Sequence, residues 1–188
     1  MPSRSGLRLS HRAFVRLCRD NPELRLERSA RGELIVMAPA GTESGGRNAK
    51  LTMRLGIWTE ADGSGEHFDS STGYVLPNGA TRSPDASWIR RERWEELSPE
   101  DRRKFAPICP DFVVELMSPS DQRSDVREKM REYLDQGARL GWLLDPEAVE
   151  VDVYRPGFPV ETLRQPTTLS GEDVLPGFVL NLKGILFG

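Results

Sequence analysis

The sequence has 188 residues, a length that fits one domain with a central sheet and covering helices, so we expect a single domain over residues 1–188. Its 37% hydrophobic and 29% charged residues exclude a disordered or fibrous chain. The net charge of −3 means that overall charge alone does not indicate nucleic-acid binding.

Apolar spacing and turn residues divide the first half of the chain into short strands and two longer helices. Ser10 is a suitable N-cap for the first helix. In chain order, we expect a helix from Ser10 to Asn21, strands at 24–28 and 33–38, a glycine-rich loop at 41–46, a helix that closes near Gly63, and strands at 67–68, 74–76 and 86–89.

The second half contains a strand, helix, strand unit. Because this unit follows several strands, the sequence predicts an α/β fold with a central mixed sheet flanked by helices. The expected elements are short helices at 91–97 and 100–105, a buried strand at 112–117, a helix from Ser124 to Gln136, a buried strand at 141–144, a strand at 149–154 with one solvent-facing side, and short strands from residue 160 onward.

The remaining composition narrows the class of protein further. Apolar runs are too short to span a bilayer and the first ten residues show no secretory signal, so we expect a cytoplasmic protein with no membrane partner. Cys18 and Cys109 are far apart and have no metal-ligand spacing, which argues against a structural zinc site.

Charge is distributed unevenly along the chain. Residues 1–54 carry 11 Arg and Lys against 5 Asp and Glu, residues 55–131 carry 11 against 15, and residues 132–188 carry 4 against 9. A basic first third could approach phosphates while the acidic remainder holds cations. A solvated arginine-rich helix face would give the same pattern, so charge alone leaves both readings open.

The segment from Gly41 to Gly46 has the glycine spacing of a phosphate-binding loop. Such a loop needs a lysine for the phosphates and a Ser or Thr for magnesium, whereas this chain has Arg47 and Asn48 at those positions. The sequence therefore argues against nucleotide triphosphate binding.

Two carboxylates, Asp85 and Glu115, stand at the ends of predicted strands. Glu115 lies in the apolar run "DFVVELM", where an unpaired buried carboxylate would be unfavourable. Carboxylates on neighbouring strands can converge on one Mg²⁺, which binds one or two of them together with water and phosphate oxygens. Otherwise, Asp85 would cap a turn and Glu115 would face solvent on a sheet edge.

Lys129 follows on the next predicted helix. At roughly 100° per residue it lies at the edge of the apolar stripe, about 40° from Tyr133. A lysine there often extends its ammonium to water along the apolar surface. Its alternative use is to orient a water molecule near the two carboxylates.

Together these residues resemble the PD-(D/E)XK nuclease superfamily. The segments "SPDASW", "CPDFVVELMSPSD", "KMREYLDQGARLGWLLDP" and "VEVDVYRPG" are similar to the "putative restriction endonuclease" family within it, a group expanded in cyanobacteria. The resemblance covers roughly residues 30–183 and implies a restriction-endonuclease-like fold. The superfamily's usual lysine would fall at Met117, and the resemblance implies that Lys129 replaces it.

The resemblance also implies roles for individual residues. Asp85, Glu115 and the backbone carbonyl of Leu116 would hold Mg²⁺ or Mn²⁺, and Lys129 would stabilise charge on the phosphate or orient the attacking water. Glu43 matches an acidic position that some members use as an extra metal or water ligand. Two residues near the start of the following helix, Arg47 and Lys50, are candidate phosphate contacts.

The expected activity is metal-dependent endonucleolytic cleavage of DNA, with a homodimer as a plausible assembly because a duplex needs two cuts. Two other functions remain open at this point. One is a non-catalytic nucleic-acid-binding or assembly module that retains the fold. The other is a small-molecule phosphoesterase that uses the same carboxylates.

Overall fold

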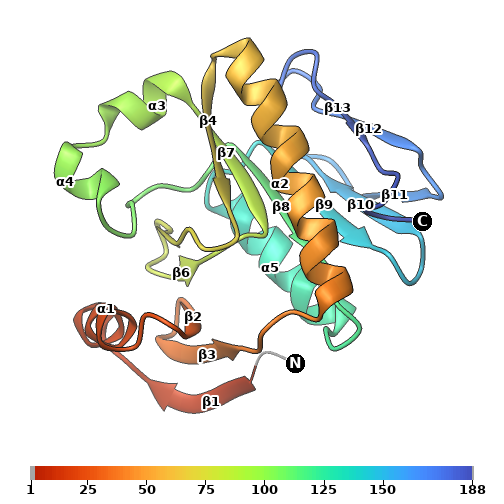
Figure 1. Ribbon diagram of the computed structural model, residues 1–188. Coiled ribbons are helices and arrows are strands. Elements are labelled where there is room, and N and C mark those ends of the chain that lie inside the picture. The colour runs from red at the N-terminus through yellow and green to blue at the C-terminus, as the bar shows by residue number, and fades with distance from the viewer. Residues whose placement is uncertain (1–2, 188) are drawn as a thin grey trace.

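The computed structural model of the chain describes residues 3–187. Its largest sheet has six strands in the order β11-β10-β9-β8-β7-β4, in which only β8 and β9 run parallel (Figure 1). The mixed α/β class expected from the sequence is confirmed. The strands are β4 (Gly65–Asp69), β7 (Ala86–Arg90), β8 (Phe112–Leu116), β9 (Leu140–Asp145), β10 (Glu150–Tyr154) and β11 (Glu161–Arg164).

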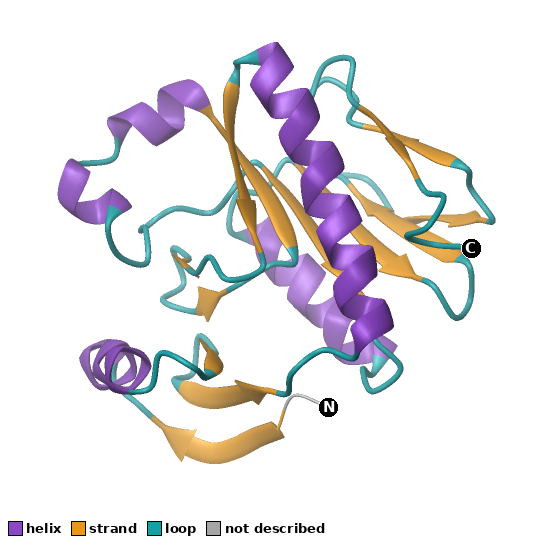
Figure 2. Ribbon diagram, viewed as in Figure 1, coloured by secondary structure: helices purple, strands orange, loops and turns teal. Residues whose placement is uncertain are grey.

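Helices cover both faces of this sheet, as Figure 2 shows for α2 (Thr42–Asp62) in front and α5 (Arg123–Asp135) behind. Alternate residues of β8 face opposite sides, so Phe112 and Val114 pack with α2 while Val113 packs with α5. Close approach of α5 needs a glycine on β9, because a Cβ at Gly141 would lie 2.5 Å from Cε of Met130.

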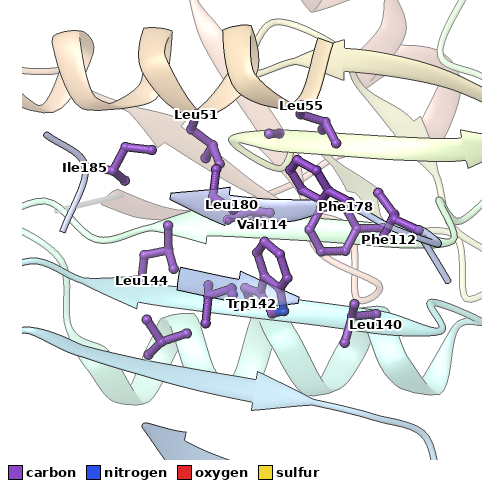
Figure 3. Close-up of a cluster of buried hydrophobic side chains, with 14 of the residues drawn as sticks. Leu51, Leu55, Phe112, Val114, Leu140, Trp142, Leu144, Phe178, Leu180 and Ile185 are labelled. Carbon is purple, nitrogen blue, oxygen red and sulfur yellow. The ribbon is translucent and has the colours of Figure 1, made fainter. Parts of the chain in front are cut away.

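The core on the α2 side also includes the C-terminal segment. Leu51 and Leu55 of α2 lie above the sheet, and the rings of Trp142 and Phe178 stack with centroids 6.1 Å apart (Figure 3). A two-stranded sheet of β12 (Thr168–Ser170) and β13 (Val179–Asn181) completes this layer. These apolar side chains come from distant segments, and their burial together stabilises the large sheet that carries the candidate site.

A second, five-stranded sheet lies at the N-terminal side, below α2 in Figure 1. We call it the N-terminal sheet. Its order is β1-β3-β2-β6-β5, and helix α1 (His11–Asp20) packs on it through Phe14. Ser10 caps α1 as predicted, with its side chain accepting from the N–H of Ala13 at 3.2 Å. The strands are β1 (Ser3–Arg8), β2 (Arg25–Arg28), β3 (Glu33–Met37), β5 (Tyr74–Val75) and β6 (Thr81–Arg82).

Several sequence predictions are corrected by the structure. Residues 42–46 form the first turn of α2 rather than a glycine-rich loop, and β1 and β6 were not predicted. The helices between β7 and β8 are α3 (Arg91–Glu96) and α4 (Pro99–Arg102), the latter shorter than expected. Strand β10 has no solvent-facing side, because Asp152 is buried against Arg123 and Arg127 of α5.

Candidate active site

Antiparallel pairing of β7 and β8 brings Asp85 to the end of β8. Ala86 pairs with Val114, and the N–H of Asp85 donates to the carbonyl of Val114 at 2.9 Å. The side chain then turns across the strand end, where Oδ2 accepts from the N–H of Leu116 at 2.8 Å. Two segments that are far apart in sequence therefore place Asp85 beside Glu115 and Leu116, as the sequence predicted for the carboxylates.

Glu115 faces α5, the side opposite to its neighbours Val114 and Leu116. One helical turn separates Lys129 from Tyr133, and both side chains reach the same oxygen of Glu115. Nζ of Lys129 lies 2.7 Å from Oε1, and the hydroxyl of Tyr133 donates to it at 3.1 Å. Lys129 thus contacts the carboxylate instead of extending to water, and Met117 packs on the core.

Glu27 on β2 is part of the same cluster, although the sequence did not indicate it. Its Oε1 lies 2.8 Å from Nζ of Lys129 and accepts from the N–H of Ser83 at 3.0 Å, while Oε2 lies 3.1 Å from Nη1 of Arg82. Arg82 also pairs with Glu132 at 2.6 Å. In the alternating pattern of β2, Glu27 lies on the face opposite to the apolar Leu26, a position that is usually exposed. Glu27 is buried only because the tertiary fold packs other elements against that face.

Burial and neighbouring charge shift the acidity of these groups. Burial raises the pKa of Glu115; the charges of Asp85 and Glu27 add to the rise, and the charge of Lys129 opposes it. Burial likewise raises the pKa of Asp85, although the hydrogen bond from the N–H of Leu116 acts to lower it. Burial lowers the pKa of Lys129, but the charges of Glu115 and Glu27 outweigh this and raise it overall, so the side chain stays an ammonium.

The carboxylates lie on a cavity of about 490 Å³ between the N-terminal sheet and α5. Asn48 on α2 also lines it: Nδ2 donates to Oδ1 of Asp85 at 3.3 Å, whereas Oδ1 of Asn48 is buried without a hydrogen-bond partner. Among residues 3–187, no group of three or more His, Cys, Asp or Glu is arranged to hold a metal. Two carboxylates and an unpartnered amide oxygen instead fit a hard cation that keeps waters, as Mg²⁺ does.

Three predicted residues lie away from this cluster. Glu43 is in the first turn of α2 with an 80% exposed side chain and pairs with Arg47 at 2.5 Å. Lys50 is exposed farther along α2, where its stem lies beside Gly184. Glu43, Arg47 and Lys50 are absent from the lining of the cavity, so their roles stay predictions.

Other arginines are better placed for a polyanion. Arg25 and Arg31 line the cavity, and Arg25 donates to the carbonyl of Ser70 at 2.7 Å. The basic first third of the sequence thus contributes cations to the cavity through the N-terminal sheet. Sequence alone could not separate these two arginines from others, such as Arg19, that lie away from the cavity, because the cavity lining depends on contacts between distant segments.

Comparisons with known proteins agree with this architecture. The model of the Uma2 family, described as "Putative restriction endonuclease", matches residues 12–183. No curated protein matches the sequence. Among solved structures, the crystal structure of a "putative nuclease belonging to DUF820" from Anabaena variabilis superposes with a TM-score of 0.74 at 20% sequence identity, covering 87% of this chain and 90% of that one. The restriction-endonuclease-like fold expected from the sequence is confirmed.

Proposed function

The chain belongs to the Uma2 family of restriction-endonuclease-like proteins, and on this premise we propose that it is a metal-dependent endonuclease that hydrolyses phosphodiester bonds of DNA. Family membership supports a nuclease activity, and nucleases with this fold generally use divalent metals. Beyond family membership, we propose that the substrate is DNA, that a divalent metal is required and that the residues named below carry out the reaction.

One observation carries the proposal. The carboxylates of Asp85 and Glu115 lie at the ends of adjacent strands, and the ammonium of Lys129 lies 2.7 Å from Glu115 on the wall of the same cavity. This contact supports the proposal that Lys129, on the following helix, acts in place of a lysine on the strand itself. This combination of two hard oxygen ligands and one cation suits stabilisation of a phosphate that gains negative charge.

Each residue has a distinct role in this proposal. Asp85 and Glu115 hold the divalent cation together with the carbonyl of Leu116. The bound cation supplies charge neutralisation and a water of lowered pKa. Lys129 orients the attacking water or stabilises the developing charge, and Tyr133 fixes the carboxylate of Glu115 through its hydroxyl. Arg25 and Arg31 attract the phosphate backbone.

A comparison of nucleic-acid substrates tests the activity. Purified protein should cut circular DNA and labelled oligonucleotides in Mg²⁺ or Mn²⁺, with no cutting in EDTA. RNA of the same sequence, run in parallel, decides between the two nucleic acids. Metal-dependent cutting of RNA alone would overturn the choice of DNA, and binding without cutting in either metal would support the non-catalytic module instead.

Assembly and location are separate matters. Among residues 3–187, no helix combines the length and apolar character needed to cross a bilayer. A homodimer and a single domain stay predictions, and the former can be checked by light scattering of the purified protein.

A further inference from the structure

Glu27 is a buried carboxylate that the proposed metal site does not use. Its side chain is only 3% exposed, and it comes from β2 of the N-terminal sheet rather than from the large sheet that carries Asp85 and Glu115. It nevertheless reaches Lys129 at 2.8 Å. A buried charge at the boundary between two sheets needs partners, and the identity of those partners indicates what it does.

The acceptors around Lys129 come from two sides. An ammonium has three N–H donors, and Nζ lies 2.7 Å from Oε1 of Glu115, 2.8 Å from Oε1 of Glu27 and 3.4 Å from the carbonyl of Ser83. Glu27 lies on β2, and Ser83 directly follows β6 in the same sheet. Two of the three acceptors therefore belong to the N-terminal sheet and hold the ammonium independently of Glu115.

Glu27 itself is fully engaged by protein donors. Lys129 and the N–H of Ser83 approach one oxygen, and Arg82 approaches the other at 3.1 Å. A carboxylate held from both oxygens in this way is poorly placed to become a metal ligand. Asp85 differs, because within the described part of the chain it makes no ion pair and accepts only from the N–H of Leu116 and, at 3.3 Å, from Nδ2 of Asn48.

We propose that Glu27 is a positioning residue for Lys129, so that the N-terminal sheet is a working part of the active site. The inference rests on the proposed function, in which Glu115 binds a divalent cation while the ammonium of Lys129 must stay at the cavity. A lysine on a flexible four-carbon stem would otherwise sample other rotamers, and misplacement of a catalytic group is costly in rate. Glu27 keeps the ammonium at the cavity while Glu115 is occupied.

The first test needs neither metal nor activity. The chain has four lysines, Lys50, Lys104, Lys129 and Lys183, so ¹⁵N labelling of lysine gives few ammonium signals, and that of Lys129 is assigned by its loss in Lys129→Met. We expect its hydrogen exchange to be slow in the wild-type protein and at least about tenfold faster in Glu27→Gln, because an anchoring acceptor is weakened. Unchanged exchange in Glu27→Gln would overturn the proposal.

A matched control is present in the same ion-pair network. Glu132 pairs with the same Arg82 at 2.6 Å but makes no ion pair with Lys129 within the described part of the chain. Glu132→Gln therefore disturbs Arg82 without removing a partner of Lys129, and it should leave the exchange of the Lys129 signal slow. Equal acceleration in both variants would mean general loosening of the fold and would also overturn the proposal.

Kinetics provide the second test. We expect Glu27→Gln to lower kcat about 10- to 100-fold with KM and Mn²⁺ affinity near wild type, the range seen when a supporting partner is removed. In the Lys129→Met background the same change should have no further effect, since Glu27 acts through Lys129. An equal loss in both backgrounds would contradict positioning. If Glu27→Gln does not fold, Glu27→Asp, which keeps the charge on a shorter side chain, takes its place in both tests.

Failure of this inference can be told from failure of the proposed function. An inactive wild-type protein whose Lys129 signal still depends on Glu27 would reject the nuclease activity and retain the positioning. An active wild-type protein, together with a Glu27→Gln variant whose Lys129 signal and kcat are unchanged, would retain the nuclease activity and reject the positioning.

Discussion

Lys129 on α5 and Glu115 on β8 form a buried ion pair, with 2.7 Å between Nζ and Oε1. The two residues belong to consecutive elements joined by a turn in which the N–H of Asp121 donates to the carbonyl of Ser118, and the parallel strand β9 follows α5 to complete the unit. The helix therefore returns across the strand that precedes it and sets its lysine over that strand's carboxylate. This relationship supports the proposed role of Lys129 in place of a lysine on the strand itself.

Replacement of Lys129 should separate chemistry from metal binding. We expect Lys129→Met to lower kcat by at least about 100-fold, as loss of one group that stabilises transition-state charge does in other enzymes. Mn²⁺ affinity should remain within a few fold of wild type, because Lys129 is not a ligand in this account. Steady-state kinetics and metal titration check the two parts, with the exposed Lys104→Met as the control.

Metal binding should depend on Asp85 far more than on Glu43. Asp85 lies at the cavity with the N–H of Leu116 bound to one oxygen, whereas Glu43 is exposed and paired with Arg47. Calorimetric titration with Mn²⁺ should show no measurable binding for Asp85→Asn and nearly wild-type binding for Glu43→Gln. Loss of binding in Glu43→Gln would show that α2 moves toward the carboxylates and would restore the metal role that the sequence suggested.

DNA binding should follow the arginines of the cavity. Because phosphate contacts release counterions, Arg31→Ala should raise KM and reduce the slope of log affinity against log salt by about 1. Arg164→Ala, on the β11 edge with an 85% exposed side chain, should leave both unchanged. Arg47→Ala and Lys50→Ala should change KM less than Arg31→Ala, and the opposite order would place the substrate along α2.

Asp152 predicts a pH dependence of stability. Burial raises its pKa, but hydrogen bonds from Arg127 and Thr162 and the charge of Arg123 outweigh this and hold the pKa below its usual value. Since the folded pKa is lower than the unfolded one, the stabilisation is complete above about pH 4 and is lost as the pH falls further.

Urea unfolding of Asp152→Asn measures this contribution. We expect the variant to be less stable than wild type by about 1 to 3 kcal/mol at pH 7, because two arginines lose a buried partner. The difference should shrink at pH 3. A difference that is constant from pH 7 to pH 3 would mean that packing, and not the carboxylate charge, explains the loss.

The parts of the fold that follow from local sequence were predictable. Ser10 caps α1, Gly63 ends α2 in the left-handed conformation with φ 73°, and the apolar run around Glu115 forms a central strand. The first turn of α2 was not predictable from local sequence. Gly45 and Gly46 favour a loop, whereas packing of Leu51 and Leu55 stabilises the helix. The prediction of a solvent-facing side on β10 was wrong. Its alternating carboxylates suggested exposure, but Asp152 is buried in ion pairs with arginines of α5.

The candidate site shows the same division. Asp85, Glu115 and Lys129 stand out because charge interrupts apolar patterns near strand ends and on a helix stripe. Glu27 and Arg82 do not stand out, since each occupies an ordinary polar position in a short strand. Only the docking of the N-terminal sheet against α5 buries them beside Lys129.

Removal of the Glu115 carboxylate tests the central claim most directly. Cleavage of circular DNA in Mn²⁺ is compared for wild type, Glu115→Ala and Glu60→Ala, where Glu60 is an exposed residue on α2 that serves as the control. We predict that Glu115→Ala stays folded by circular dichroism and loses cleavage to the level of the EDTA control, while Glu60→Ala cuts like wild type. Equal cleavage by Glu115→Ala and wild type would contradict the assignment of the active site.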